Sequence, residues 1–136
     1  MRKKARGVQH FGLHLTLDCY GCKPSLLDRR STARRFLNSA VKKLGMTKLY
    51  GPIVVRAPGN DKKDPGGWSG FVVIQESHIS VHTFPKRKFV SVDIYSCRDF
   101  SHGRVAVFVK NFFGADSTEK NIITRGRRYP IRNFAE

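Results

Sequence analysis

A Glu-Ser-His tripeptide, Glu76-Ser77-His78, stands between two apolar runs that are typical of β-strands. A second histidine, His82, follows Ser77 by five residues, and Cys97 follows it by twenty. Such a polar tripeptide has no evident role in folding, so we interpret it as chemical. If the backbone breaks before Ser77, the serine becomes a new N-terminal group. A chain without a bound coenzyme can make an electrophile from such a group.

The residue types allow a specific reaction at this bond. The Ser77 hydroxyl can attack the carbonyl carbon of Glu76, which converts the amide into an ester. Removal of the Ser77 α-proton then eliminates the Glu76 carboxylate, and the dehydroalanine that remains tautomerises and hydrolyses to a pyruvoyl group. Each step needs a positioned proton carrier, and histidine is the usual one near neutral pH.

The stretch closely resembles the S-adenosylmethionine decarboxylase proenzyme family in its short prokaryotic form. The resemblance is carried by the Glu-Ser-His tripeptide, by the segments flanking it and by a segment near the N-terminus, namely Ser69-Gly70, 82–85 (His-Thr-Phe-Pro), 92–97 (Val-Asp-Ile-Tyr-Ser-Cys), 12–15 (Gly-Leu-His-Leu) and 18–22 (Asp-Cys-Tyr-Gly-Cys). It extends from about Phe11 to about Arg127. Family members cleave themselves between the Glu and the Ser. The resemblance therefore implies a single domain cut into residues 1–76 (β chain) and 77–136 (α chain).

The resemblance also implies a role for each polar residue. Ser77 becomes the pyruvoyl cofactor, which forms a Schiff base with the substrate amine and withdraws electrons from it. His82 is the proton carrier in processing, and Ser69 assists it. Cys97 is the proton donor to the carbanion left by loss of carbon dioxide. A thiol is largely protonated near neutral pH and can serve as that acid.

Two positions depart from the family pattern, and both concern the grip on a nucleoside. The family carries a Glu that holds the ribose hydroxyls where this chain has Lys86, and an ammonium group cannot accept those hydrogen bonds. The family also has an aromatic residue before the Ser-Gly strand, whereas the loop 58–65 has none and Trp68 is the nearest candidate. We therefore take Trp68 and Lys86 as weak candidates for substrate contacts.

S-adenosylmethionine is the first expectation for the substrate, with a role in supplying the aminopropyl donor for spermidine biosynthesis. Some relatives with altered nucleoside contacts decarboxylate ornithine or arginine, so a pyruvoyl-dependent decarboxylase of one of these is the alternative. All three substrates carry a second cationic group that needs a local carboxylate. Asp18, Asp93 and the new Glu76 terminus are the candidates.

The composition predicts one domain and no membrane segment. A chain of 136 residues with 40% apolar residues can form a single two-layer core. No apolar stretch approaches the length of a membrane span, and no hydrophobic segment follows the basic residues at 2–6, so we expect a cytoplasmic protein. Residues 1–8 and 128–136 are expected to be basic tails.

The charge leaves a second function class open. Twenty-six Lys and Arg against ten Asp and Glu give a formal charge of +16, which is common among nucleic-acid-binding proteins. The basic residues are scattered, however, and no RNA-binding or zinc-finger pattern accompanies them. We expect a solvated surface and no nucleic-acid partner. A non-catalytic basic homologue that binds nucleic acid or another subunit is the competing hypothesis.

The three cysteines favour free thiols over a disulfide framework, because an odd number cannot pair completely. Cys19 and Cys22 form a Cys-x-x-Cys pair, which can supply half of a zinc site. No second pair exists in the sequence. We interpret the pair as structural and expect no metal.

Periodicity predicts the elements that must position these residues. Alternation predicts strands near 10–18, 79–82 and 90–95, and a continuous apolar run predicts one at 71–74. Two further strands are predicted near 49–56 and 121–124. An apolar stripe at helical spacing predicts a helix at 29–44 that ends at Gly45, and a second helix is predicted at 104–113 before Gly114. The run 71–74 is predicted as a central strand buried on both sides.

Strands and helices in this order predict an α+β two-layer sandwich, with an antiparallel sheet and two helices on one face. The other face of the sheet would then lack a cover. Together with the resemblance, this uncovered face predicts a homodimer.

Overall fold

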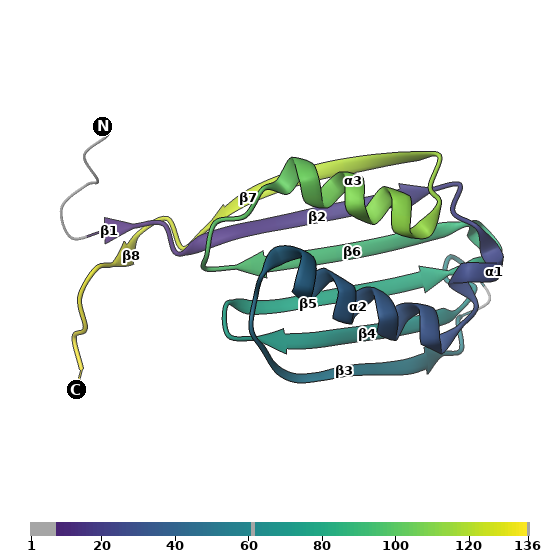
Figure 1. Ribbon diagram of the computed structural model, residues 1–136, viewed down its shortest axis with the longest axis horizontal. Coiled ribbons are helices and arrows are strands. Elements are labelled where there is room, and N and C mark those ends of the chain that lie inside the picture. Colours follow the sequence, from purple (N-terminus) through teal and green to yellow (C-terminus); the bar gives the residue numbers. More distant parts are fainter. Residues whose placement is uncertain (1–7, 61, 136) are drawn as a thin grey trace.

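The computed structural model describes residues 8–60 and 62–135, and its centre is one six-stranded antiparallel sheet. The strand order is β3-β4-β5-β6-β2-β7, and the helices cover one face (Figure 1). The strands are β2 (Gly12–Tyr20), β3 (Lys48–Ala57), β4 (Gly67–Ile74), β5 (Ser77–Phe84), β6 (Phe89–Ser96) and β7 (Ser117–Arg125). The predicted α+β sandwich is therefore confirmed.

Two long helices form the second layer, as predicted. They are α2 (Arg30–Leu44) and α3 (His102–Phe113), and each ends at a glycine in the left-handed conformation, Gly45 and Gly114. Two short elements were not predicted: α1 (Pro24–Leu27) and the 3₁₀ turn η1 (Pro85–Arg87). Within the described residues, no helix is long and apolar enough to span a bilayer.

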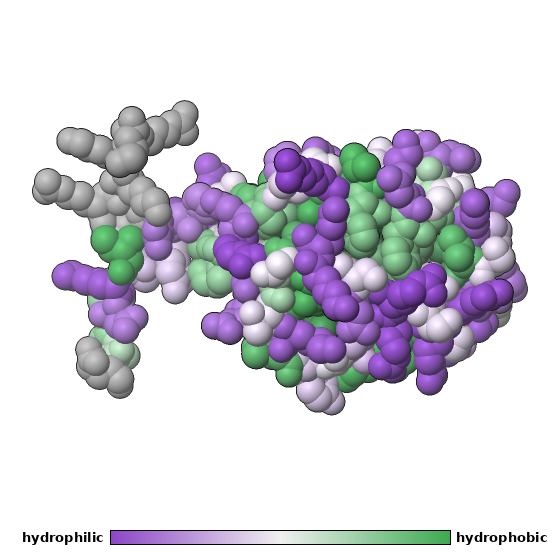
Figure 2. All heavy atoms as spheres, viewed as in Figure 1, coloured by the Kyte–Doolittle hydropathy of each residue, from purple (hydrophilic) through white to green (hydrophobic). Residues whose placement is uncertain are grey.

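The core lies between the helices and one face of the sheet. On α2 the apolar stripe is buried against the strands, and the ring of Phe36 packs on those of Phe108, Phe112 and Phe113. The outer side of this layer carries hydrophilic side chains around a strip of apolar ones (Figure 2). This arrangement leaves the other face of the sheet without a helical cover.

The prediction that residues 71–74 are buried on both sides is wrong. Val72 and Ile74 are buried against the helices, but Phe71 on the other face is 40% exposed. The physical reason is that the sheet is antiparallel, and its connections place both long helices on the same side. The edge strand β3 is irregular, because its register shifts once on each side of Tyr50.

A two-stranded ribbon projects from the body of the domain. It pairs β1 (Val8–Gln9) with β8 (Tyr129–Pro130), and it leaves the sheet at the end of the strands where β2 begins (Figure 1). The described part of the expected 128–136 tail is therefore partly a strand. Of the expected 1–8 tail, residues 1–7 lie outside the described residues.

Candidate active site

The Glu-Ser bond lies in a two-residue hairpin turn between β4 and β5. The sheet pairs Ile74 with Ser77, so Gln75 and Glu76 form the turn itself. The segment before β3 holds this turn in place from outside: the Gln75 N–H donates to the Thr47 carbonyl at 2.8 Å, and the Thr47 N–H donates to Glu76 Oε1 at 3.2 Å. Both contacts hold the turn on the N-terminal side of the scissile bond. No pattern in the sequence marks Thr47 for this role.

The backbone of Ser77 is strained. Its φ angle is +150°, a region that residues with a Cβ atom rarely occupy. Of the other described residues, only glycines and Lys88 have positive φ. A non-glycine residue in such a region costs roughly 1–3 kcal/mol, and such strain is concentrated at functional sites. The strain here lies on the residue whose N–C bond the predicted cleavage breaks, so cleavage would release it.

The carbonyl of the scissile bond is already polarised. The backbone N–H of Cys97 donates a hydrogen bond to the Glu76 carbonyl oxygen at 2.8 Å. When a hydroxyl attacks this carbonyl, negative charge develops on its oxygen, and a positioned N–H stabilises that charge. Sequence reasoning assigned Cys97 only through its thiol. The N–H contact depends on the β5–β6 register, in which Ser77 faces Ser96.

The Cys97 side chain is exposed and lies one residue beyond the end of β6. Its neighbour Ser96 is buried, and the Ser96 hydroxyl exchanges hydrogen bonds with the backbone of Arg98 at 2.7 Å and 2.9 Å. These contacts fix the chain on the far side of Cys97. Cys97 therefore follows directly on the residue that pairs with Ser77, and its thiol is exposed.

Ser69 and His82 form a second cluster. They face each other across β4 and β5, and the Ser69 hydroxyl lies 2.8 Å from His82 Nδ1. This contact orients the imidazole and leaves proton transfer to Nε2. The hairpin between β4 and β5 therefore brings together two residues that are thirteen positions apart in the sequence.

The structure does not bring His82 to Ser77 within one chain. Both residues lie on β5, five positions apart, and a strand advances about 3.3 Å per residue. Their backbones are therefore separated by roughly 16 Å. A histidine side chain cannot bridge that distance, because a proton carrier must come within hydrogen-bond reach of its target.

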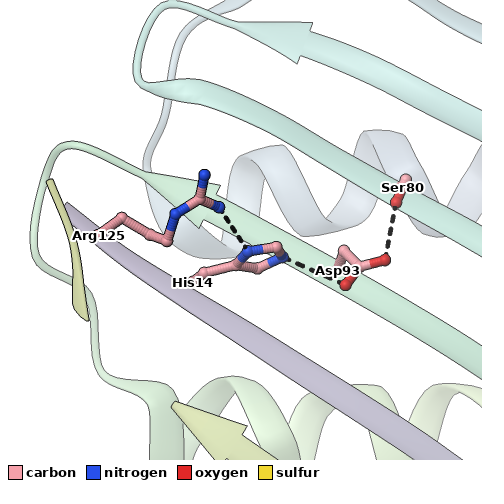
Figure 3. Close-up of polar contacts among 4 residues, drawn as sticks. All are labelled: His14, Ser80, Asp93 and Arg125. Carbon is pink, nitrogen blue, oxygen red and sulfur yellow. Dashed lines mark hydrogen bonds and ion pairs between the residues drawn. The ribbon is translucent and has the colours of Figure 1, made fainter. Parts of the chain in front are cut away.

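The uncovered face of the sheet carries a polar network between these clusters (Figure 3). Arg125 donates to His14 Nδ1 at 3.1 Å, so Nε2 is the nitrogen that donates to Asp93, at 3.2 Å. Ser80 donates to the second oxygen of Asp93 at 3.4 Å. Asp93 was a sequence candidate for a cation contact. Here it is the centre of a network that includes Arg125, which no sequence pattern indicated.

Burial changes the acidity of two groups on this face. It lowers the pKa of His78 from its ordinary value, with further lowering by His14 and Arg125 and an opposing effect of Asp93. Partial burial also raises the pKa of Asp18, and the neighbouring carboxylates of Glu119 and Asp93 add to that rise. Both shifts favour the neutral forms, as is usual for groups that leave water.

The two weak candidates for substrate contacts lie apart from the reacting centre. Trp68 points to the helical side of the sheet, opposite to Ser69, and the guanidinium groups of Arg30 and Arg56 each lie 5.2 Å from its ring centroid. Lys86 is exposed in the turn after β5. The structure brings neither of them to Ser77 of the same chain.

The Cys19–Cys22 pair is part of the core. Both side chains are buried, and burial raises the pKa of Cys19 to about 12 and that of Cys22 to about 11. Thiols that resist deprotonation are poor nucleophiles and poor metal ligands. This environment supports the structural interpretation of the pair.

Comparisons with known proteins agree with this site. The profile of the S-adenosylmethionine decarboxylase family matches residues 13–126. The chain is 33% identical to the S-adenosylmethionine decarboxylase proenzyme of Hydrogenobaculum sp. (strain Y04AAS1) over 85% of this chain and 81% of the relative. It is 31% identical to that of Bacillus velezensis, over 88% of this chain and 89% of the relative.

A solved structure is also similar. The crystal structure of the adenosylmethionine decarboxylase from Aquifex aeolicus superposes with a TM-score of 0.73 at 29% identity, covering 94% of this chain and 98% of that one. The matched region includes the strained Glu76–Ser77 turn, the Ser69–His82 pair and Cys97. This chain belongs to the S-adenosylmethionine decarboxylase family.

Proposed function

We propose that this chain is a self-processing, pyruvoyl-dependent S-adenosylmethionine decarboxylase. The observation that carries the proposal is the Glu76–Ser77 turn: the serine is strained at φ +150°, and the carbonyl before it accepts a 2.8 Å hydrogen bond from the Cys97 N–H. The family named by the relatives supports the same reaction. In this proposal the product supplies aminopropyl groups for spermidine biosynthesis.

Processing uses groups of the chain itself. Ser77 Oγ attacks the Glu76 carbonyl carbon, the C–N bond breaks, and the Cys97 N–H stabilises the charge on the carbonyl oxygen. The imidazole of a His82, oriented by Ser69, carries the protons, including the one removed from the Ser77 α-carbon. Elimination releases the Glu76 carboxylate, and hydrolysis with loss of ammonia leaves a pyruvoyl group at position 77.

The pyruvoyl group supplies a ketone that binds the substrate amine and accepts electrons when carbon dioxide leaves. The residues of the chain then have to hold the substrate and return a proton to carbon. The exposure of Cys97 and its position directly after Ser96, which pairs with Ser77, support such a role. We assign it the role of proton donor.

Replacement of Cys97 by alanine should separate processing from turnover. The backbone N–H that polarises Glu76 is still present in the variant, so the chain should still cleave itself. Without the thiol, decarboxylation should slow by roughly 10²- to 10⁴-fold, the usual contribution of a positioned acid. Mass spectrometry of the fragments and release of labelled carbon dioxide measure the two steps. Full turnover in Cys97→Ala would remove this residue from the mechanism.

The substrate is decided by a direct comparison. Purified, processed protein is incubated in parallel with carboxyl-labelled S-adenosylmethionine, ornithine and arginine, and the released carbon dioxide is compared. We expect S-adenosylmethionine to turn over. Lys86 is the reason to include ornithine and arginine, because a lysine cannot accept hydrogen bonds from ribose hydroxyls. Turnover of ornithine or arginine alone would leave the chemistry in place and make the named substrate wrong.

Two variants sharpen that comparison. If Lys86 stands where a ribose contact is missing, Lys86→Glu should lower the KM for S-adenosylmethionine by about 10-fold or more, since one such contact is worth roughly 1–3 kcal/mol. Lys88→Glu, two residues further along, makes the same change of charge and is the matched control.

We further propose that the active form is a homodimer in which each site is shared. The roughly 16 Å between Ser77 and His82 on β5 means that one chain does not hold both at one centre. If the uncovered sheet faces pack together about a twofold axis that crosses the strands, the start of β5 lies over the end of the partner's β5. Ser77 and Cys97 then meet His82 of the partner subunit.

The uncovered face supports this arrangement. It carries large apolar side chains, Phe71 and Val55 among them, next to the network around Asp93. Apolar patches of this kind are typical of protein–protein contacts. The proposal includes a cytoplasmic location, because the Cys97 thiol has to stay reduced, and it includes no nucleic-acid partner. A wild-type chain that does not decarboxylate any of the substrates, but binds nucleic acid with an affinity that Ser77→Ala does not change, would instead be the non-catalytic basic homologue.

A further inference from the structure

Three segments of the chain meet at the scissile bond, at the end of the sheet where α2 and β6 end and β5 begins (Figure 1). The β4–β5 turn contains the bond itself. The segment after α2 holds this turn, because the Thr47 carbonyl accepts the Gln75 N–H at 2.8 Å. The segment after β6 donates the Cys97 N–H to the Glu76 carbonyl, also at 2.8 Å. The geometry at the bond therefore depends on how the segments after α2 and after β6 lie relative to each other.

Arg98 joins these two segments directly. It follows Cys97 by one residue, and its guanidinium group donates hydrogen bonds to the carbonyl oxygens of Leu44 at 2.7 Å and of Gly45 at 2.9 Å. Carbonyl groups at the end of a helix lack partners within the helix and carry a partial negative charge, so an arginine is a suitable donor there. The Arg98 side chain thus ties the chain after β6 to the end of α2.

The backbone of Arg98 is fixed as well. The buried Ser96 hydroxyl accepts the Arg98 N–H at 2.9 Å and donates to the Arg98 carbonyl at 2.7 Å. Hydrogen bonds therefore run in a closed cycle from the end of α2 through Arg98 and Cys97 to Glu76, and back through Thr47 to the residues just after α2. Such supporting contacts decide how precisely a reacting group is held.

The helix α2 is a firm support for this cycle. Phe36, Leu37 and Ala40 on its inner side are buried in the core, and its last turn closes with the Gly45 N–H donating to the Lys42 carbonyl at 3.0 Å. The Cys97 side chain, in contrast, is exposed, so burial of that side chain does not fix its position. Arg98 therefore links an exposed reacting residue to the packed core.

We propose that Arg98 is a positioning residue for both steps of the reaction. In self-cleavage it holds residue 97 so that the backbone N–H meets the Glu76 carbonyl oxygen. In decarboxylation it holds the Cys97 thiol next to position 77. This inference rests on the proposed function, in which the N–H stabilises charge during processing and the thiol returns a proton to carbon. Arg98 acts through Cys97 in each case.

The variant Arg98→Ala should impair both steps. Self-cleavage should slow by about 10- to 100-fold, because a misplaced donor loses much of the roughly 10²- to 10³-fold that one such donor contributes. In the cleaved fraction, kcat for release of carbon dioxide from labelled S-adenosylmethionine should also fall while KM stays unchanged. Cell-free synthesis followed by intact-mass measurement gives the cleavage rate. Cys97→Ala differs from this variant, since it is expected to lose turnover alone.

Two further variants separate positioning from a general effect of charge. Arg98→Lys keeps a cation that can donate to the same carbonyl oxygens, and it should restore most of the cleavage rate. Arg34→Ala removes an exposed arginine from the outer side of α2 and should be cut like the wild type. Thermal unfolding of each variant, combined with Ser77→Ala to keep the chain uncut, gives the folded fraction to which the cleavage rates are referred.

Either of two results would overturn the positioning role alone. One is a folded Arg98→Ala chain that is cut at the wild-type rate and turns over with the wild-type kcat. The other is a chain that does not fold without Arg98, which would make the residue a structural one. A wild-type chain that is never cut contradicts the proposed function itself, so the two failures are distinguishable.

Discussion

Replacement of Ser77 by alanine is expected to leave a single uncut chain that releases no carbon dioxide from any amino acid. The wild-type chain should yield two fragments, 1–76 and 77–136, and the second should be blocked at its N-terminus and lighter by one ammonia than a free serine fragment. In the variant, the nucleophile that attacks the Glu76 carbonyl is missing, although the Cys97 N–H still polarises it. Intact-mass measurement distinguishes these outcomes directly.

The effect should be all-or-none, because the same side chain is the nucleophile of processing and the source of the ketone. Ser31→Ala, on the exposed side of α2, is a matched loss of one hydroxyl and should process normally. Cleavage of the Ser77→Ala chain at the same bond would show that Ser77 is not the nucleophile. A wild-type chain that stays uncut would contradict the proposed function as a whole.

The identity of the reacting residues could be predicted from the sequence, whereas their arrangement could not. Ser69 and His82 are thirteen residues apart, and a hairpin between them places both on one face, so the 2.8 Å contact follows from alternation once the turn is known. The relation of His82 to Ser77 is different. The five positions between them on one strand fix the distance from Ser77 to His82 of the same chain. The sequence does not reveal whether His82 of the same chain or of a partner acts on Ser77.

The fold was predictable where a periodic apolar pattern extends over many residues and a helix-ending residue follows it. The stripe on α2 and the glycine after it, Gly45, gave its bounds to within one residue of Arg30–Leu44. The run 71–74 was misread because four consecutive apolar residues do not reveal whether one or both faces are covered. The ribbon was missed since its strands, Val8–Gln9 and Tyr129–Pro130, are too short to show any period.

Backbone contacts were beyond the reach of sequence patterns altogether. The Cys97 N–H meets the Glu76 carbonyl because β5 and β6 pair Ser77 with Ser96, and any residue type at position 97 other than proline would supply the same donor. The strain at Ser77 likewise depends on the two-residue turn and on its contacts with Thr47. The Cys97 N–H contact and the strain at Ser77 both act on the scissile bond, and both depend on how β4, β5 and β6 pair.

Mixing two inactive variants should restore cleavage if the site is shared between protomers. His82→Ala keeps Ser77 but lacks the proton carrier, and Ser77→Ala keeps His82 but cannot be cut. Each chain produced alone is expected to remain uncut. Produced together, they form mixed dimers in which Ser77 of the first chain faces His82 of the second. The His82→Ala chain should then be cleaved and should release carbon dioxide from substrate.

The identity of the cut chain is what makes this experiment decisive. With a mass tag on one variant, only the His82→Ala chain should appear as fragments, and its cleaved share should follow the fraction of mixed dimers. The second site of each mixed dimer contains both substitutions and stays inactive, so one site per dimer is the upper limit. If His82 acted on Ser77 of its own chain, no combination of these variants could be cut. Absence of cleavage in verified mixed dimers would overturn the shared site. It would also remove His82 from processing, because roughly 16 Å along β5 separates it from Ser77 of its own chain.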